Sequence, residues 1–404
     1  MTMVNARIES TQELLEEAEQ SILFTTVRPG IVMDYGKEMY LWDTNGRKYL
    51  DFIGGWAVTC LGHCPEVMVK ALTEQASRLI NASPSFWNKP MIHFAKLLTD
   101  HSCFDRVFFA SSGAEANEGA IKLARKYGSI HRKGAYEIIT AVNGFHGRTL
   151  ATMSATGKEK WKDLFEPKVS GFKHVPLNDI HAMKSALSSN TCAIMLEPIQ
   201  GEGGVIVSDE GYIKALRQLC DETGVLLIFD EVQTGIGRTG KLFAYEHYGI
   251  EPDIMTLAKG IGGGFPLSAL LTKEKFNIFE AGDQGGTYSS QPLGMEVGFA
   301  VVNEVIQKEL ANNAEKQGEY IQTKLYSIAE EFNLKNIRGM GLLIAFDLPT
   351  DSGSEIVSEC LNHGLIINSP RPNVIRLMPP LIVEEKDVDV MDEILTNALK
   401  KILS

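Results

Sequence analysis

Two charged side chains stand just after apolar runs, where a buried strand would deliver them to a ligand. Asp230 follows Val225–Phe229, and Lys259 follows Asp253–Leu257 and precedes a stretch rich in glycine. A lysine among glycines, which let the backbone approach a ligand closely, can serve as a nucleophilic amine or hold a phosphate. The ordinary alternatives are that Asp230 caps the next turn and that Lys259 is a surface lysine beside a flexible loop.

A predicted helix after the run Arg106–Phe109 offers a place for an anion. Ser111 or Ser112 can cap this helix, and Gly113 stands at the turn where the first backbone N–H groups are free. Such groups bind phosphate, although an ordinary capped helix has the same Ser-Gly before Glu.

Further charged residues follow other apolar runs. Phe145 and Arg148 share one glycine-flanked turn. Glu197 ends an apolar run, and Glu202 lies in the glycine-rich loop behind it. Arg376 stands inside an apolar run, where an arginine must find a partner or face a cleft.

No metal site is expected from this sequence. Cys60, His63 and Cys64 lie close together, but no second cluster completes a zinc site. His146, taken alone, is expected to be a structural histidine rather than a catalyst. The chain also lacks the G-x-S-x-G motif of a Ser-His-Asp hydrolase.

The elements that must position these residues alternate between short apolar runs and helical patterns. The predicted strands are Arg106–Phe109, Glu137–Val142, Cys192–Leu196, Val225–Phe229, Asp253–Leu257 and Leu267–Leu271. Helical patterns between them include Glu115–Tyr127 and Gly211–Thr223. This alternation predicts an α/β fold with a mostly parallel sheet sandwiched by helices, and ligands gather at the carboxyl ends of such strands.

The pattern changes from about Pro292 onward. The predicted elements there are the helices Gly294–Leu310, Gln317–Phe332 and Glu385–Leu403 and the strands Leu342–Leu348 and Val374–Met378. We interpret them as a smaller α+β domain that the hairpin-like segment Tyr40–Phe52 joins. The predicted organisation is a large domain over residues 61–295 and a small domain built from residues 1–60 and 296–404.

The amino-acid composition argues against several classes of function. The 404 residues include 39 Lys or Arg and 51 Asp or Glu, for a formal net charge of −12. This acidic balance argues against binding to nucleic acid or to an anionic membrane, and no apolar run is long enough to span a bilayer. The six cysteines form no CxxC pair, and the N-terminal residues are acidic. We therefore expect a cytoplasmic protein with reduced thiols.

Five segments together resemble the class III, fold-type I aminotransferases, which use pyridoxal 5′-phosphate (PLP). They are SSGAEANEGAIKLAR, GFHGRT, EPIQGEGG, LIFDEVQTGIGRTGK and TLAKGIGGGFP, in the family's order and roughly at its spacing. The resemblance runs from about Tyr40 to Leu377 and is nearest to the acetylornithine and ornithine aminotransferases.

The resemblance implies roles around the cofactor ring. Lys259 matches the lysine that links covalently to PLP, and Asp230 matches the carboxylate that pairs with the pyridine nitrogen, a pairing known for PLP enzymes in general. Gln233 matches the residue near the ring O3′, and Phe145 would lie on one face of the ring. Lys259 and Asp230 are thus the implied catalytic pair.

The resemblance also implies how the phosphate is held and that two subunits share their sites. Gly113 and Ala114 would donate backbone N–H groups to the phosphate. Thr287 matches a threonine that reaches the phosphate of the neighbouring subunit, which implies a homodimer.

Substrate contacts are implied as well. Arg376 matches the arginine that binds the α-carboxylate of glutamate, and Glu202 matches the glutamate that neutralises it when an ω-amine enters. Arg148 matches the arginine that binds the donor's own carboxylate. Trp56 stands where acetylornithine enzymes usually have a smaller aliphatic residue, near the substrate-facing wall.

The expected activity is transfer of an amino group from an ω-amino or acylated diamino acid to 2-oxoglutarate, giving glutamate by a ping-pong mechanism. Two alternatives stay open: other PLP chemistry on this scaffold, such as an aminomutase, epimerase or decarboxylase, and a non-catalytic binding protein. The sequence departs from the family at Ser289-Ser290-Gln291, where glycines are common, and at Gly62-His63-Cys64-Pro65, which is one residue shorter.

Overall fold

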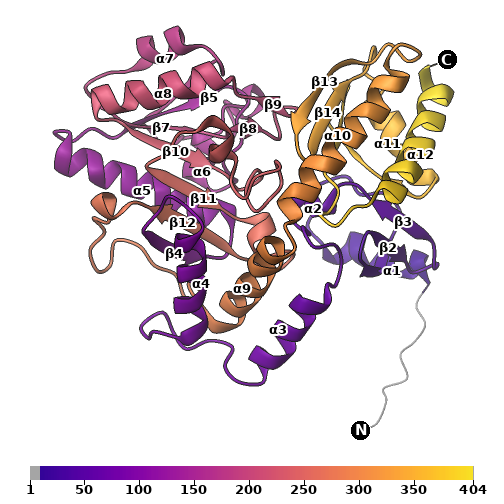
Figure 1. Cartoon of the computed structure of the whole chain (residues 1–404), viewed down its shortest axis with the longest axis horizontal. Coiled ribbons are helices and arrows are strands. Elements are labelled where there is room, and N and C mark those ends of the chain that lie inside the picture. Colours follow the sequence, from indigo (N-terminus) through magenta and orange to yellow (C-terminus); the bar gives the residue numbers. More distant parts are fainter. Residues whose placement is uncertain (1–9, 404) are drawn as a thin grey trace.

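A seven-stranded sheet forms the centre of the larger part of the molecule in a computed structural model that describes residues 10–403 (Figure 1). In spatial order its strands are β4 (Arg106–Ala110), β12 (Ser268–Thr272), β11 (Ile254–Leu257), β10 (Leu226–Asp230), β7 (Thr191–Leu196), β5 (Glu137–Ala141) and β6 (Phe172–Val175). The pairs among β11, β10, β7, β5 and β6 are parallel, whereas β12 is antiparallel to both of its neighbours. The predicted α/β fold with a mostly parallel sheet is confirmed.

The reversal at β12 follows from the length of its connection. Only residues 258–267 join β11 to β12, and a parallel crossover needs a dozen or more residues, usually a helix. Lys259 is the second residue of this short connection, so the lysine lies at the sheet edge where β11 ends.

Helices cover both faces of the sheet, and alternate residues of each strand pack against opposite layers. In β10, Leu226 and Ile228 pack in the cluster that contains Leu123 of α5 (Gly113–His131). Leu227 and Phe229 instead belong to the cluster that contains Leu216 of α8 (Glu210–Thr223). Burial on both faces explains why this strand is an unbroken apolar run.

Two four-stranded sheets lie beside the large one, and β8 (Ile199–Gln200) pairs with β9 (Ile206–Val207) in a separate two-stranded sheet. An antiparallel four-stranded sheet has the order β13 (Lys335–Met340), β14 (Leu343–Asp347), β17 (Val374–Leu377), β16 (Asn368–Arg371). The other four-stranded sheet has the order β1 (Met33–Lys37), β2 (Tyr40–Asp43), β3 (Lys48–Asp51), β15 (Leu365–Ile366), in which β15 is parallel to β3. Segments from the two ends of the chain therefore share one sheet. The boundaries at residues 60 and 295 stay predictions, and residues 1–9 of the predicted first segment lie outside the described residues.

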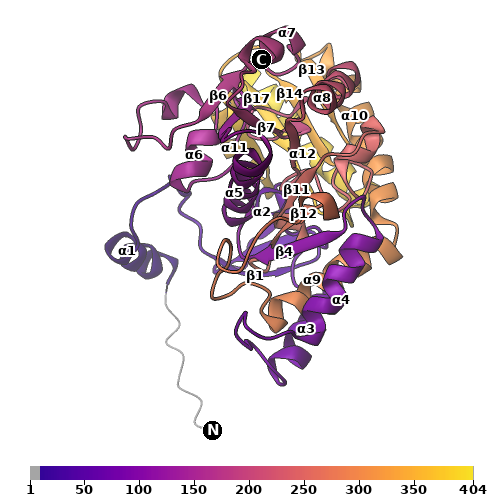
Figure 2. The same cartoon turned by 90° about the vertical axis from the view of Figure 1, so that its left-hand side faces the viewer.

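The remaining elements connect or flank these sheets. They are α1 (Thr11–Ser21), α2 (Gly54–Ala57), α3 (Glu66–Ala76), α4 (Lys89–Asp100), α6 (Leu150–Ala155), α7 (Ile180–Ala186), α9 (Pro292–Gln307), α10 (Leu310–Ala329), α11 (Gly353–Asn362) and α12 (Glu385–Leu403). Figure 2 shows α1 at the edge of the molecule, where none of its residues is buried and Thr11 Oγ1 forms hydrogen bonds with Thr44 (2.7 Å) and Asn45 (3.0 Å).

Several elements differ from the sequence prediction. The edge strand β6 was not predicted, because its sequence Phe-Lys-His-Val is short and half polar. Helix α9 ends at Gln307 rather than at Leu310, and α10 begins seven residues before the predicted Gln317. Glu309 between them has a left-handed backbone (φ 50°), which interrupts what reads as continuous helical spacing.

Within residues 10–403, no helix is long and apolar enough to cross a membrane. The same part of the chain contains no group of three or more His, Cys, Asp or Glu side chains placed to hold a metal ion.

Candidate active site

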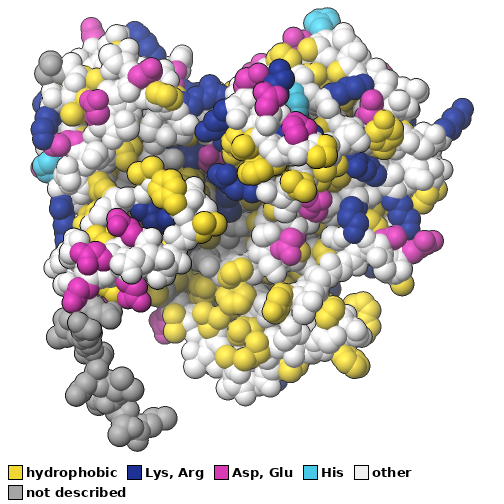
Figure 3. Space-filling view, turned by 180° about the vertical axis from the view of Figure 1, so that it is seen from behind, with side chains coloured by type: hydrophobic (Ala, Val, Ile, Leu, Met, Phe, Trp, Pro, Cys, Tyr) yellow, Lys and Arg dark blue, Asp and Glu magenta, His cyan; other side chains and the backbone are white. Residues whose placement is uncertain are grey.

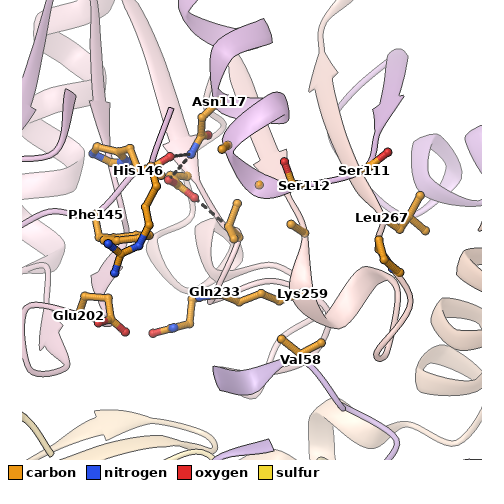
Figure 4. A pocket seen from close by; sticks show the side chains of 18 of the residues that line it. Val58, Ser111, Ser112, Asn117, Phe145, His146, Glu202, Gln233, Lys259 and Leu267 are labelled. Carbon is orange, nitrogen blue, oxygen red and sulfur yellow. Dashed lines mark hydrogen bonds and ion pairs between the residues drawn. The ribbon is translucent and has the colours of Figure 1, made fainter. Parts of the chain in front are cut away.

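A cavity of about 410 Å³ opens at the carboxyl ends of β4, β5, β10 and β11. Figure 4 shows it with Ser112 on one side, Phe145 and Glu202 on the other, and Lys259 and Gln233 between them in this view. The predicted site residues that line it are Gly113, Ala114, Phe145, Arg148, Glu202, Asp230, Gln233 and Lys259. Residues predicted from separate strand ends thus meet in one cavity.

Asp230 ends β10 and is only 3% exposed. Its Oδ1 accepts a hydrogen bond from the backbone N–H of Val232 (3.1 Å), so the carboxylate does cap the following turn. Its Oδ2 accepts from His146 Nδ1 and Asn117 Nδ2, both at 2.8 Å. A carboxylate has about four acceptor positions, so one position remains for a donor inside the cavity. The capping role and the ligand role are compatible.

Asn117 and His146 hold this carboxylate in place. Thr256 Oγ1 donates to Asn117 Oδ1 (2.6 Å), which fixes the amide so that its NH₂ group faces His146 O and Asp230. Burial would lower the pKa of His146, but the hydrogen bond and charge of Asp230 outweigh it and the pKa is raised. His146 therefore favours the protonated form beside Asp230. The sequence analysis treated His146 as a structural histidine and did not predict its hydrogen bond to Asp230.

The backbone of Lys259 is left-handed (φ 51°). This conformation costs free energy for a non-glycine residue, and it recurs at functional sites. Burial lowers the pKa of Lys259 to about 8, although the nearby charge of Glu202 works in the opposite direction. An appreciable share of the amine is therefore neutral near physiological pH, and a neutral amine is a nucleophile and a base.

The first turn of α5 forms an anion site on the cavity wall. Ser112 caps this helix, since its Oγ accepts from the N–H of Glu115 (3.3 Å). The N–H groups of Gly113 and Ala114 belong to the turn whose donors have no acceptor inside the helix, and both residues line the cavity. A Cβ at Gly113 would lie 3.0 Å from Val232, so a side chain there would crowd the wall.

Arg376 is completely buried in β17, and two of its partners, Glu202 and Gln233, line the cavity. Its Nη2 lies 2.8 Å from Glu202 Oε1, its Nη1 donates to Gln233 Oε1 (3.4 Å) and its Nε donates to Asn368 Oδ1 (3.1 Å). Burial alone would raise the pKa of Glu202, but Arg376 outweighs it and the pKa is lowered. The sequence predicted that an arginine inside an apolar run needs a partner, and Glu202 is that partner.

The opposite wall is aromatic and basic. The rings of Phe145 and Trp161 meet edge to face with centroids 5.8 Å apart. The exposed Arg148 places its guanidinium 4.9 Å from the centre of the Trp161 ring, at the mouth of the cavity. Arg148 is thus available to an anion that enters from solvent.

Glu197 is a buried carboxylate of the cavity wall for which the sequence analysis predicted no role. It accepts from the N–H groups of Phe145 (2.9 Å) and Gly201 (3.3 Å), so it ties the aromatic turn to the Glu202 loop. Burial raises its pKa to about 7. The one feature of the sequence that could have indicated a role for Glu197 in the site is its position directly after β7.

Three predicted residues do not line the cavity in this chain: Arg376, which contacts the lining residues Glu202 and Gln233, and Trp56 and Thr287. Trp56 is 55% exposed, although Val58 of the same segment does line it. Thr287 is exposed, and its carbonyl accepts from Asn81 Nδ2 (3.4 Å). The short segment at Cys64 faces a different cavity.

The chain is similar to known proteins over nearly its whole length. The sequence model of a family described as aminotransferase class-III matches residues 25–399. A curated acetylornithine aminotransferase from Ralstonia nicotianae is 50% identical over 388 residues, which are 94% of this chain and 97% of that protein.

Solved structures agree with this similarity. An ornithine aminotransferase from Toxoplasma gondii, with PLP at partial occupancy in its active site, has a TM-score of 0.93 and 29% identity, covering 98% of this chain and 95% of that one. An acetylornithine aminotransferase from Elizabethkingia anophelis has a TM-score of 0.87 and 32% identity, covering 98% and 100%.

Proposed function

We propose that this chain, which belongs to the class-III aminotransferases and is therefore a PLP-dependent transaminase, uses acetylornithine or a closely related ω-amino acid as its amino donor. We propose 2-oxoglutarate as its amino acceptor. The observation that carries this proposal is the ion pair of Arg376 and Glu202 at the cavity that holds Lys259. A site that must accept both a dicarboxylate and an ω-amine needs a cation that a neighbouring carboxylate can neutralise.

The residues of the cavity fit PLP. The N–H groups of Gly113 and Ala114 would hold its phosphate, the free acceptor position of Asp230 would pair with its protonated ring nitrogen, and Lys259 would link to its aldehyde. When bound, PLP supplies an electron-accepting ring that stabilises negative charge on the substrate carbon that loses a proton.

Lys259 is the base of the proposed reaction. Its lowered pKa leaves a share of the amine neutral, so it can take the proton from the substrate carbon that carries the amino group. His146 and Asn117 keep the Asp230 carboxylate oriented while this happens. The site therefore separates two tasks: a fixed carboxylate for the ring and a mobile amine for the proton.

Arg376, Glu202 and Arg148 would sort the two substrates. With an acylated diamino acid, Glu202 stays on Arg376 and the donor's carboxylate binds Arg148 at the mouth. With 2-oxoglutarate, the α-carboxylate replaces Glu202 on Arg376, for which a planar guanidinium is well suited. Alternation of the two substrates in one cavity gives a ping-pong scheme.

A panel of donors tests this proposal. Purified holoenzyme is incubated with acetylornithine, ornithine, 4-aminobutyrate or lysine, each with 2-oxoglutarate or pyruvate, and glutamate or alanine is quantified. We expect the highest kcat/KM with acetylornithine and 2-oxoglutarate, and parallel double-reciprocal plots. Racemised, shifted or decarboxylated product without glutamate would favour other PLP chemistry, and no product at all would favour a binding protein.

We also propose that the active form is a homodimer. Hydrophobic side chains gather on the lower part of the face seen in Figure 3, an arrangement typical of interfaces. The exposed hydrophobic residues of the segment 79–92 are Leu79, Ile80, Phe86, Trp87 and Ile92. Hydrogen bonds from Asn81 to Thr287 and from Asn88 to Ser290 tie this segment to the exposed Thr287. A second copy on this surface would take Thr287 to the neighbouring site.

Replacing Ile80 and Trp87 together by glutamate is expected to give a monomer with at least tenfold lower activity. Trp87 is 85% exposed, so the change removes apolar surface from an interface without touching the core. Sedimentation velocity measures the mass, and Ile130→Glu, at an exposed site on α5, is the matched control. A monomeric variant with full activity would contradict shared sites.

A further inference from the structure

Glu202 stands between two cations, and each of its oxygens faces a different one. Oε1 lies 2.8 Å from Arg376 Nη2, whereas Oε2 lies 3.7 Å from Lys158 Nζ. The first contact is a close ion pair, and the second is just beyond hydrogen-bond distance. Glu202 is thus bound to Arg376 with a second cation next to it.

Lys158 is held in place without a strong partner of its own. Its Nζ lies 5.0 Å from the centre of the Phe145 ring and 5.3 Å from that of Trp161, and it forms no hydrogen bond within the described part of the chain. Burial lowers its pKa although Glu202 raises it, so the ammonium is incompletely compensated. A carboxylate that moved toward it would satisfy both groups.

The position of Lys158 separates it from the substrates. It lines a neighbouring cavity of about 390 Å³, which Trp161 also lines, and it does not line the cavity that holds Lys259. Glu202 lines the latter cavity. Lys158 therefore reaches the reaction through Glu202 rather than by contact with a substrate.

We propose that Lys158 is the alternative anchor of Glu202 and so a positioning residue for acceptor specificity. The inference rests on the proposed alternation of substrates at Arg376. When a dicarboxylate takes Arg376, the displaced Glu202 is still largely buried, and a buried carboxylate without a partner is costly. Transfer of Glu202 to Lys158 removes that cost and keeps Arg376 open. The donor half-reaction leaves Glu202 on Arg376 and makes no use of this transfer.

Binding of glutarate to the holoenzyme tests the proposal without turnover. Glutarate has the two carboxylates of 2-oxoglutarate but no carbonyl to react, and its Kd can be measured by titration calorimetry. We expect Lys158→Met to weaken glutarate about tenfold, the scale of one hydrogen bond to a charged group. Lys158→Arg should restore binding to within about threefold, because it keeps the charge. The KM of the amine donor should stay unchanged.

The Glu202→Gln variant shows whether Lys158 acts by positioning Glu202 or by direct contact with glutarate. In Glu202→Gln there is no charged side chain to relocate, so adding Lys158→Met should leave the Kd of glutarate unchanged. A tenfold loss that persists in this background would show that Lys158 binds the ligand itself and would overturn the proposal. An unchanged Kd in the single variant Lys158→Met would overturn it as well.

A nearby lysine and the wild-type protein provide the controls. Lys162→Met removes an exposed lysine whose ion pair within residues 10–403 is with Glu159, at 3.6 Å, and it should leave the Kd of glutarate as in the wild type. Wild-type holoenzyme that binds no glutarate would contradict the proposed acceptor class. Wild-type binding that Lys158→Met leaves intact would contradict only the role of Lys158.

Discussion

Lys259→Ala is expected to lower kcat for glutamate formation by at least about 10⁴-fold, which corresponds to about 5 kcal/mol of activation free energy. The variant loses both the amine that would link to PLP and the base that would move the substrate proton. The visible absorbance of the covalently bound cofactor should disappear at the same time. Steady-state rates and an absorbance spectrum of the purified protein measure the two effects.

Lys241→Ala is the matched control, because Lys241 is exposed and does not line the cavity. It should keep both the rate and the spectrum. A Lys259→Ala protein that retains the absorbance band and more than a hundredth of the activity would place the covalent link on another residue.

The same lysine sets a pH dependence that can be measured on protein stripped of PLP. Burial disfavours its ammonium form, so the neutral amine that captures the aldehyde becomes dominant as the pH rises through about 8. The rate of capture, followed by absorbance after addition of PLP, should rise to a plateau above that pH. An ordinary lysine would give a rise near pH 10.4, and such a result would contradict the burial of the amine.

Asp230→Asn is expected to lower kcat by about 10³-fold, the scale of removing a preorganised charge from an active site. The change is nearly isosteric, but it removes the negative charge that would keep the ring nitrogen protonated. It also brings an NH₂ group among the donors His146 and Asn117, which need an acceptor. Single-turnover rates with the donor measure the loss of activity. Equilibrium dialysis measures the dissociation constant of PLP, which should increase.

Asp253→Asn distinguishes lost chemistry from lost stability. Asp253 is also a buried carboxylate of the sheet, where it accepts from Leu227 N (2.8 Å) and Arg217 Nη1 (3.0 Å), but it lies outside the cavity. This variant should lower Tm while its cofactor spectrum and single-turnover rate stay near those of the wild type. If both variants lose the same activity at a temperature where they are folded, Asp230 has no special role.

The sequence predicted the strands well where both faces are buried and poorly where they are not. β10 was located to within one residue because its apolar run is unbroken. β6 was missed because an edge strand needs few apolar residues, and its Lys173 and His174 hide the pattern. Hydropathy reports burial, so an element that is half exposed gives little signal.

The candidate site was predicted in part for a similar reason. Asp230 and Lys259 were found because strand ends are visible in the sequence, and parallel strands bring those ends to one edge. The contact of Asn117 with Asp230 joins residues 113 positions apart, and no local pattern reports it. Lys158 was missed because its importance depends on a distance to Glu202 that only the fold fixes. The roles of Thr287 and Trp56 stay predictions.

The pairing of β15 with β3 has a consequence for synthesis of the chain. Leu365 pairs with Leu50, so the partner of β3 is translated 315 positions later. At about 5–20 residues per second, β3 waits on the order of 15–60 s on the ribosome with one edge unsatisfied. The nascent polypeptide therefore needs protection from aggregation during that interval, and any premature stop codon before residue 365 would leave the edge open permanently.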